Sequence, residues 1–361
     1  MLRGLLFVFT ILYSGFLVGH PAWGIVLSPD GHIYFTDIFH NNGTLWKTDK
    51  TGNQLAVVLT QHHSHDIFMD DSGAIWGTDD DYISSTEENE IHLWKLSPKG
   101  HKKVIIPPTR APGELGGAVF GIDASEQIYF IFDSQLFRRK ADSAPELVLD
   151  HQFGHVTSLK VGPDGNIYLA DNMPNRGRIY QVTPEGVLSD FGKFLKDAPP
   201  LDPPFPEPQF DLLFGMTFDE MGDLYVTNSG GRKLVKVTSP KAGGQIISAI
   251  YRAEAPWYPV GIALDGAEKY ILEVAFEAEK GNFGPRIVHL DKFNQKTILI
   301  NVEAYLQNNP QPAQAEYKKK IFLDIPKEWQ LNLAMGILIG LVGLVIVIIQ
   351  SRKRKKEDKN S

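Results

Sequence analysis

Hydrophobic and polar residues follow a repeated pattern along this chain. A short hydrophobic run, a turn rich in aspartate and glycine, and a second hydrophobic run that ends in a polar residue recur six times. The clearest copies span 24–37, 158–171 and 214–228, and weaker copies span 66–79, 119–133 and 261–273. Alternating hydrophobic residues separated by Asp-Gly turns are typical of β-hairpins. Because no stretch before residue 300 has convincing helical periodicity, the pattern predicts an all-β body.

Each copy predicts the first two strands of a four-stranded unit. The matching second-strand positions are Ile33, Ile75, Ile128, Ile167, Leu224 and Tyr270, which are roughly 40 to 57 residues apart. Four strands at this spacing are typical of propeller blades, whereas a stacked solenoid would need shorter and more uniform repeats. The sequence therefore predicts an all-β, six-bladed β-propeller of four-stranded blades over residues 20–302.

The two ends of the chain predict membrane targeting. Residues 5–18 are hydrophobic and follow Arg3, so residues 1–19 are interpreted as a signal peptide, or as an uncleaved signal anchor. Residues 331–349 contain no charge, which predicts a transmembrane helix over 331–350. Residues 303–330 have the composition of a stalk.

Charge sets the expected orientation of this helix. Residues 351–361 form a basic tail, and positively charged flanks stay in the cytoplasm. The propeller is then outside the cytoplasm, in a periplasmic or extracellular position. Gly336 and Gly340 form a small-xxx-small pair that predicts a possible homodimer through this helix, although glycine is common in membrane helices.

Composition excludes several classes of function. The formal net charge is −7, so the chain lacks the basic surface that nucleic-acid binding needs. The chain has no cysteine, which excludes thiol catalysis, thiolate metal sites and disulfides. It also lacks the nucleophile elbow of serine hydrolases, the phosphate-binding Walker loop and the zinc-protease histidine motif.

A histidine-rich segment is the densest group of ligand-type side chains. It includes His63, His65 and Asp66, and alignment of the repeats places His155 opposite His63. Imidazoles and carboxylates together suit a divalent metal such as Zn²⁺, and Ca²⁺ is the other candidate. The alternative is that these histidines are solvated or hydrogen-bond the junction between blades.

Two further sets of residues have competing interpretations. Asp37, Asp79, Asp171 and Asn228 end equivalent strands; they could form a ring of ligands, but their recurrence favours a structural role in which they hydrogen-bond backbone turns. Trp257 and Tyr258 offer aromatic surface for a sugar, lipid or peptide, or for packing between blades.

The repeated strings at 24–37, 158–171 and 215–228, with the related string at 259–265, resemble those of the NHL-repeat and SMP-30/gluconolactonase-like six-bladed propellers. The resemblance implies the propeller fold over about 25–300. For lactonases of this group, it implies a metal held in the central channel by residues at the starts of the inner strands. The corresponding residues of this chain are Trp23, His65, Ala118, Thr157, Phe214 and Val260.

Only His65 in that set is a good metal ligand, so the chain is more similar to NHL-type recognition propellers. The leading hypothesis is a membrane-anchored extracytoplasmic propeller that binds a protein, glycan or small-molecule ligand through one face. The alternative is a metal-dependent lactonase or esterase that uses His63, His65, Asp66 and His155. A third possibility is a scaffold that binds other membrane proteins through Gly336 and Gly340.

Overall fold

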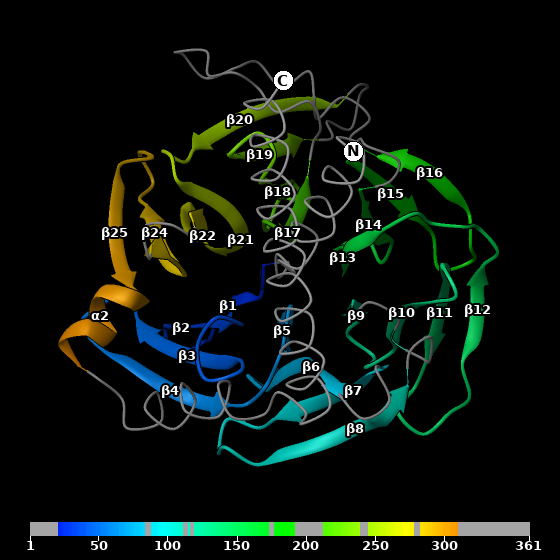
Figure 1. Cartoon of the computed structure of the whole chain (residues 1–361). Helices are drawn as coiled ribbons and strands as arrows, with labels where there is room; N and C mark the ends of the chain where they lie inside the picture. Colours follow the sequence, from blue (N-terminus) through cyan, green and yellow to red (C-terminus); the bar gives the residue numbers. More distant parts are fainter. Residues whose placement is uncertain are drawn as a thin grey trace, which may run out of the picture. The chain divides into compact units, whose positions relative to one another are not determined.

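The computed structural model describes residues 21–83, 88–110, 115, 119–172, 177–191, 212–238, 245–277 and 282–309. These residues form six antiparallel sheets, and Figure 1 shows the sheets arranged radially around a central axis. We call the region along this axis, between the inner strands, the channel. The predicted all-β, six-bladed propeller is therefore confirmed.

The strands follow one another from the channel to the rim in each blade. Blade 1 contains β1 (Ile25–Leu27), β2 (His32–Asp37), β3 (Thr44–Asp49) and β4 (Leu55–Thr60), and blade 2 contains β5 (Ile67–Met69), β6 (Ile75–Ile83), β7 (Glu88–Leu96) and β8 (Lys102–Arg110). Blade 3 contains β9 (Phe120–Ile122), β10 (Ile128–Phe132), β11 (Gln135–Arg139) and β12 (Glu146–Leu149).

Blades 4 to 6 continue in the same order. Blade 4 contains β13 (Val156–Val161), β14 (Ile167–Asp171), β15 (Arg178–Val182) and β16 (Leu188–Phe191), and blade 5 contains β17 (Leu213–Phe218), β18 (Leu224–Asn228), β19 (Lys233–Thr238) and β20 (Ile246–Arg252). Blade 6 contains β21 (Trp257–Asp265), β22 (Glu268–Glu277), β24 (Arg286–Leu290) and β25 (Lys296–Asn301), with the short β23 (Asn282–Phe283) paired to β22.

Aspartates stabilise the tight turns that the sequence pattern predicts. In the turn between β5 and β6, Oδ1 of Asp70 accepts hydrogen bonds from the backbone N–H groups of Ser72 and Ala74, both at 3.0 Å. The same arrangement recurs at four other aspartates. In each, Oδ1 accepts hydrogen bonds from the backbone N–H groups two and four residues later in the chain; these are Asp49, Asp123, Asp219 and Asp291. A carboxylate that satisfies two turn N–H groups favours the hairpin locally.

The polar residues at the ends of the second strands have the predicted structural role. Asp37 accepts from the N–H of Phe39 at 2.8 Å, in the segment that follows its strand. Asp79 and Asp171 differ from the expectation, because they accept from backbone N–H groups of the segment that precedes their own blade, at His63 and His155 respectively, both at 2.7 Å. These carboxylates therefore fix the connection between one blade and the next.

The propeller body continues a few residues beyond the predicted boundary at 302. Helix α2 (Val302–Asn308) follows β25, and the side chain of Asn301 accepts a hydrogen bond from the N–H of Ala304 at its N-terminus. Val302 and Leu306 are buried in the main hydrophobic cluster. Helix α2 therefore belongs to the compact unit that ends at Asn309 and occupies the start of the predicted stalk.

Several predictions concern residues outside the described part of the chain. They are the signal peptide at 1–19, most of the stalk, the transmembrane helix at 331–350 with Gly336 and Gly340, and the basic tail at 351–361. Among the residues that the structure does describe, no helix combines the length and hydrophobicity needed to cross a membrane.

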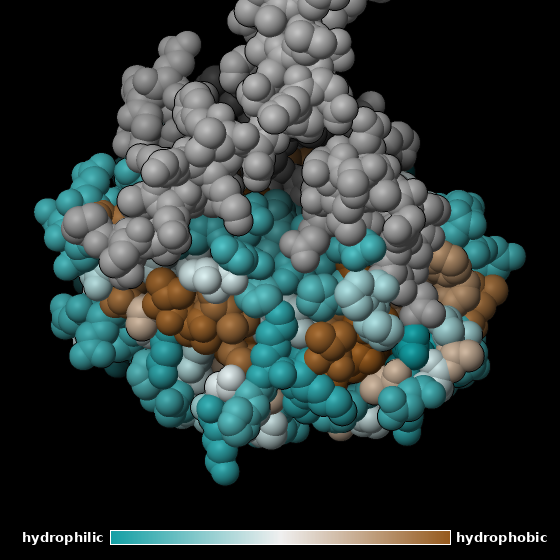
Figure 2. All heavy atoms as spheres, turned by 60° about the horizontal axis from the view of Figure 1, so that its bottom comes forward, coloured by the Kyte–Doolittle hydropathy of each residue, from teal (hydrophilic) through white to brown (hydrophobic). Residues whose placement is uncertain are grey.

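The rim of the propeller carries scattered hydrophobic residues. Figure 2 shows separate hydrophobic patches on the forward side, divided by hydrophilic surface. Exposed examples in the outermost strands are Val104, Leu147, Ile246 and Ile298. Single hydrophobic residues at a protein surface are ordinary, so the rim does not identify a functional site.

Candidate functional site

The propeller has two faces, which the chain builds differently. We call the loop face the side with the connections between blades, such as 61–66, and with the connections between second and third strands. We call the turn face the side with the tight turns between first and second strands, such as 70–73 and 123–126. The residues predicted as a site lie on or near the loop face.

Aromatic and hydrophobic side chains fill the channel near the loop face. The ring of Trp23 stacks on His65 at 5.3 Å between centroids and lies 5.4 Å from the ring of Phe214. The three side chains come from three different blades, and each is at most 4% exposed. Val260 and Thr157 are also buried, and Ala118 lies outside the described residues. The described side chains at this end of the channel are therefore packed like those of a protein core.

The structure brings the side chains of His63 and His65 together, whereas the carboxylate of Asp66 has other partners. The rings of His63 and His65 meet edge to face at 4.8 Å. Asp66 is buried, and its two carboxylate oxygens have different partners. Oδ1 accepts from the N–H of Ile67 at 2.9 Å, and Oδ2 pairs with Nζ of Lys160 at 2.8 Å. Lys160 belongs to β13 of blade 4, so this ion pair crosses the channel.

The other predicted site residues lie in different settings. His155 is exposed; its backbone N–H donates to Asp171, and its backbone carbonyl accepts from the N–H of Asn172. Trp257 and Tyr258 each have an arginine over the ring: Arg286 lies 3.9 Å from the Trp257 centroid and Arg232 lies 4.6 Å from the Tyr258 centroid.

The contacts of Asp66, Trp257 and Tyr258 weaken the case for a metal site and for an aromatic binding surface. In the described part of the chain, no three His, Asp or Glu side chains are grouped so that they could hold a metal ion. The carboxylate of Asp66 is neutralised by a lysine, which competes with a cation for the same oxygen. The arginines over Trp257 and Tyr258 occupy aromatic surface that a sugar or peptide would otherwise use. Ligand binding by these residues stays a prediction.

Sequence reasoning missed a cluster around Asp79. His62 hydrogen-bonds Oδ2 of this carboxylate, and Nε2 of His92 lies 3.8 Å from the same oxygen. Burial is the main cause that lowers the pKa of His92, although the charge of Asp79 opposes it. Residues 79 and 92 are cross-strand partners in the β6–β7 hairpin, so the hairpin register was the signal that could have found this cluster.

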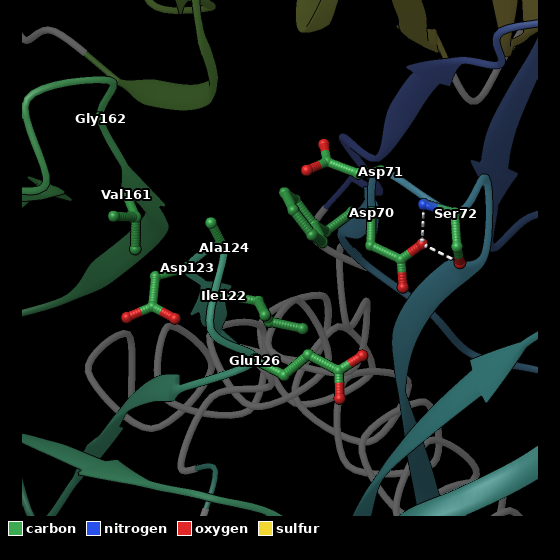
Figure 3. Close-up of a pocket in the computed structure, with 10 residues that line it drawn as sticks. Asp70, Asp71, Ser72, Ile122, Asp123, Ala124, Glu126, Val161 and Gly162 are labelled. Atoms are coloured by element: carbon green, nitrogen blue, oxygen red, sulfur yellow. Dashed lines mark hydrogen bonds between the residues drawn. The ribbon is translucent and has the colours of Figure 1, made fainter.

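A cavity of about 310 Å³ lies on the turn face, between blades 2, 3 and 4. Its hydrophobic wall is formed by Phe68, Ile122 and Val161, which are at or near the ends of the inner strands β5, β9 and β13. Figure 3 shows Ile122 and Val161 beside the turn residues Asp70, Asp71 and Asp123. The sequence pattern does not indicate this cavity, because the cavity forms only where the inner strands of three blades lie side by side.

Carboxylates from two turns line the same cavity. Asp70 and Asp71 come from the β5–β6 turn, and Asp123 and Glu126 come from the β9–β10 turn. Burial acts to raise the pKa of Asp70, but hydrogen bonds from Lys95, Ser72 and Trp76 outweigh it and hold the pKa well below its usual range. Asp70 is therefore ionised at neutral pH.

Comparison with known proteins gives no family for this chain. No family model matches the sequence, and no curated protein matches it. A streptogramin B lyase structure is 18% identical with a TM-score of 0.48 over 78% of this chain and 84% of that chain. A virginiamycin B lyase from Staphylococcus aureus is 15% identical, with a TM-score of 0.48 over 77% and 83%. A glucose dehydrogenase is 14% identical, with a TM-score of 0.49 over 73% and 95%. At these values the likenesses carry no argument about activity.

Proposed function

We propose that the protein is a membrane-anchored extracytoplasmic propeller that binds a ligand or a partner protein through one face, the turn face. The observation that carries this proposal is the contrast between the two ends of the channel. The loop-face end is filled by Trp23, His65 and Phe214, whereas the turn face has a cavity of about 310 Å³. Concave sites that combine hydrophobic walls with a few polar groups are typical of ligand binding.

The packing at the loop-face end favours binding over metal-assisted hydrolysis. A hydrolytic metal needs several free ligands and an open position for water. Here Asp66 is held by Lys160, and His65 is packed against Trp23. A metal at this position would have to displace an ion pair and separate stacked rings.

The membrane anchor rests on the sequence. The uncharged run 331–349 is long enough to cross a bilayer, and the basic residues after it favour a cytoplasmic tail. A propeller held outside the cytoplasm in this way would present one face to ligands or to other surface proteins.

The test uses the full-length protein in lipid nanodiscs. Its thermal unfolding temperature is measured with organic cations, carboxylates, neutral sugars, Zn²⁺ and Ca²⁺, and in parallel with γ-butyrolactone and p-nitrophenyl acetate as substrates. We expect stabilisation by at least one ligand class and no turnover. Hydrolysis that a chelator abolishes, or the lack of any stabilising ligand, would contradict the proposal.

The anchor is tested separately in intact cells. We expect an external protease to reach the propeller, and a label on the 351–361 tail to react only after the membrane is permeabilised. The reverse pattern would show that the orientation is wrong.

A further inference from the structure

We propose that the turn-face cavity binds an organic cation with a hydrophobic stem, meaning an ammonium or guanidinium group carried on an alkyl chain. This inference rests on the proposed function, since it names the ligand class for that face. The charge of the cavity, its hydrophobic wall and its size all favour a ligand of this class.

The charge of the cavity is strongly negative. Its lining, which lies wholly within the described chain, includes the carboxylates of Asp70, Asp71, Asp123 and Glu126 and no positively charged side chain. Lys95 is a neighbouring cation, with Nζ at 2.8 Å from both Asp70 and Glu126. The lining itself contributes four carboxylates and no positive charge, so the cavity surface carries an excess of negative charge that attracts cations.

The four carboxylates differ in how many hydrogen-bond partners they have within the protein. Asp70 and Asp123 accept several hydrogen bonds within their own turns, which fixes them in place. Asp71 is exposed, and its side chain has no hydrogen-bond or ion-pair partner in the part of the chain that is described. Figure 3 shows the Asp71 carboxylate apart from the Asp70–Ser72 hydrogen bonds. A ligand cation can therefore pair with Asp71 without breaking a turn.

The hydrophobic wall distinguishes this cavity from a site for a bare metal ion. Phe68, Ile122 and Val161 come from three different blades and all line the cavity. Their packing is set by the strands, so this surface exists before a ligand binds. An alkyl stem would cover it, at a gain of about 25 cal/mol per Å² of hydrophobic area removed from water.

The cavity size fits a small ligand or a single side chain. A volume of about 310 Å³ is at the lower end of ligand pockets, which run from about 300 to 1,000 Å³. A free amine and the lysine or arginine side chain of a partner both present the required group. These two sources have the same chemistry, and the experiment below separates them.

The experiment titrates the full-length protein in nanodiscs by isothermal calorimetry. The probes are n-butylguanidine and n-butylamine, with butyrate as the anionic counterpart and N-acetyl-arginine amide as the model of a protein side chain. We expect the cations to bind with one site per chain, more weakly as salt is raised, and butyrate not to bind. Tighter binding of the arginine amide would indicate a protein partner, and tighter binding of the free cations a small molecule.

Three variants test whether the cavity is the site. Asp71→Asn should weaken butylguanidine binding about tenfold, because it removes one charge-assisted contact. Ala124→Phe, at an exposed lining residue, should block binding while it leaves every charge in place. Asp142→Asn is the matched control, an aspartate in the β11–β12 turn outside the cavity, and should have no effect.

Several results would overturn the inference. They are equal binding of butyrate, no saturable binding of either cation, or cation binding that Ala124→Phe leaves unchanged, which would indicate general surface charge. If cations fail while sugars or carboxylates stabilise the protein, the ligand class is wrong and the proposed binding function stands. If no ligand class binds and hydrolysis is observed, the proposed function itself fails.

Discussion

At the scale of single residues, His40 is a buried side chain whose contacts couple stability to pH. Its side chain is 9% exposed, and its two ring nitrogens face two carboxylates. Nδ1 lies 2.6 Å from Asp37 at the end of β2, and Nε2 lies 3.3 Å from Glu303 in α2. Burial acts to lower the pKa of His40, but the hydrogen bonds and charges of Asp37 and Glu303 outweigh it, so the pKa is raised.

The raised pKa predicts a direction for stability against pH. A histidine whose pKa is higher in the folded state than in the unfolded state stabilises the fold fully below about pH 6.5, and this contribution is lost as the pH rises through the folded pKa. We expect the free energy of unfolding to fall over that range, as measured by urea denaturation of the full-length protein. Glu303→Gln should make this decline shallower, and should cost about 0.5 kcal/mol at pH 6.

Glu254 provides the matched control for this prediction. It is an 84% exposed glutamate that pairs loosely with Lys296 at 3.7 Å, away from His40. Glu254→Gln should leave the slope of stability against pH unchanged. An equal change of slope in both variants would mean that net charge, and not the His40 contact, controls the pH dependence.

At the scale of the strands, close contact between inner strands limits which residues fit. The Cα of Gly261 in β21 packs so near to blade 1 that an added Cβ would lie 2.3 Å from the carbonyl oxygen of Trp23. Gly266, in the turn after β21, has open space around it but a φ of +56°. Gly261 is therefore required because there is no room for a side chain, and Gly266 is required because of its backbone conformation.

Substitution of each glycine by alanine should give different losses of stability. Gly266→Ala should cost about 1 kcal/mol, from backbone strain alone. Gly261→Ala should cost more, about 3 kcal/mol, because the new methyl group overlaps backbone atoms that cannot move without separating two blades. The measurement is the urea unfolding midpoint of each variant. Equal costs would show that inner strands adjust more easily than their spacing indicates.

The sequence could predict the structure within each blade, but not the contacts between blades. Strands and turns within one blade depend on neighbouring residues, so the Asp-Gly pattern located them correctly. Contacts between blades depend on how the ring closes: Asp66 and Lys160 are 94 residues apart, and Trp23 of blade 1 lies against Phe214 of blade 5. No local pattern contains that information, which is why the filled channel and the turn-face cavity were not predicted.

At the scale of the whole molecule, no strand among the described residues is shared between the first and the last blade. Blade 1 consists of the first four described strands, and blade 6 consists of the last strands of the propeller. Side chains join them instead. Lys50 of blade 1 pairs with Asp265 of blade 6, and the hydroxyl of Tyr305 in α2 donates to the carbonyl of Leu55 at 3.2 Å. Helix α2 therefore helps to hold the two ends of the propeller together.

The ion pair between Asp66 and Lys160 adds a contact across the channel, between blades 2 and 4. The side chains are 4% and 17% exposed, so the pair is largely removed from water. Breaking such a pair leaves a charge without its partner, and the cost depends on which charge remains.

The whole-molecule prediction is an asymmetric response to loss of each partner. Lys160→Met leaves the more deeply buried carboxylate, that of Asp66, without its partner, and should lower the free energy of unfolding by about 3 kcal/mol. Asp66→Asn should cost about 1 kcal/mol, because the new amide side chain keeps an oxygen for the N–H of Ile67 and the lysine retains some access to water. The double variant removes both charges and should be more stable than Lys160→Met alone. Urea unfolding of all four proteins gives the coupling energy, and additive costs would mean that the two blades are not linked through this pair.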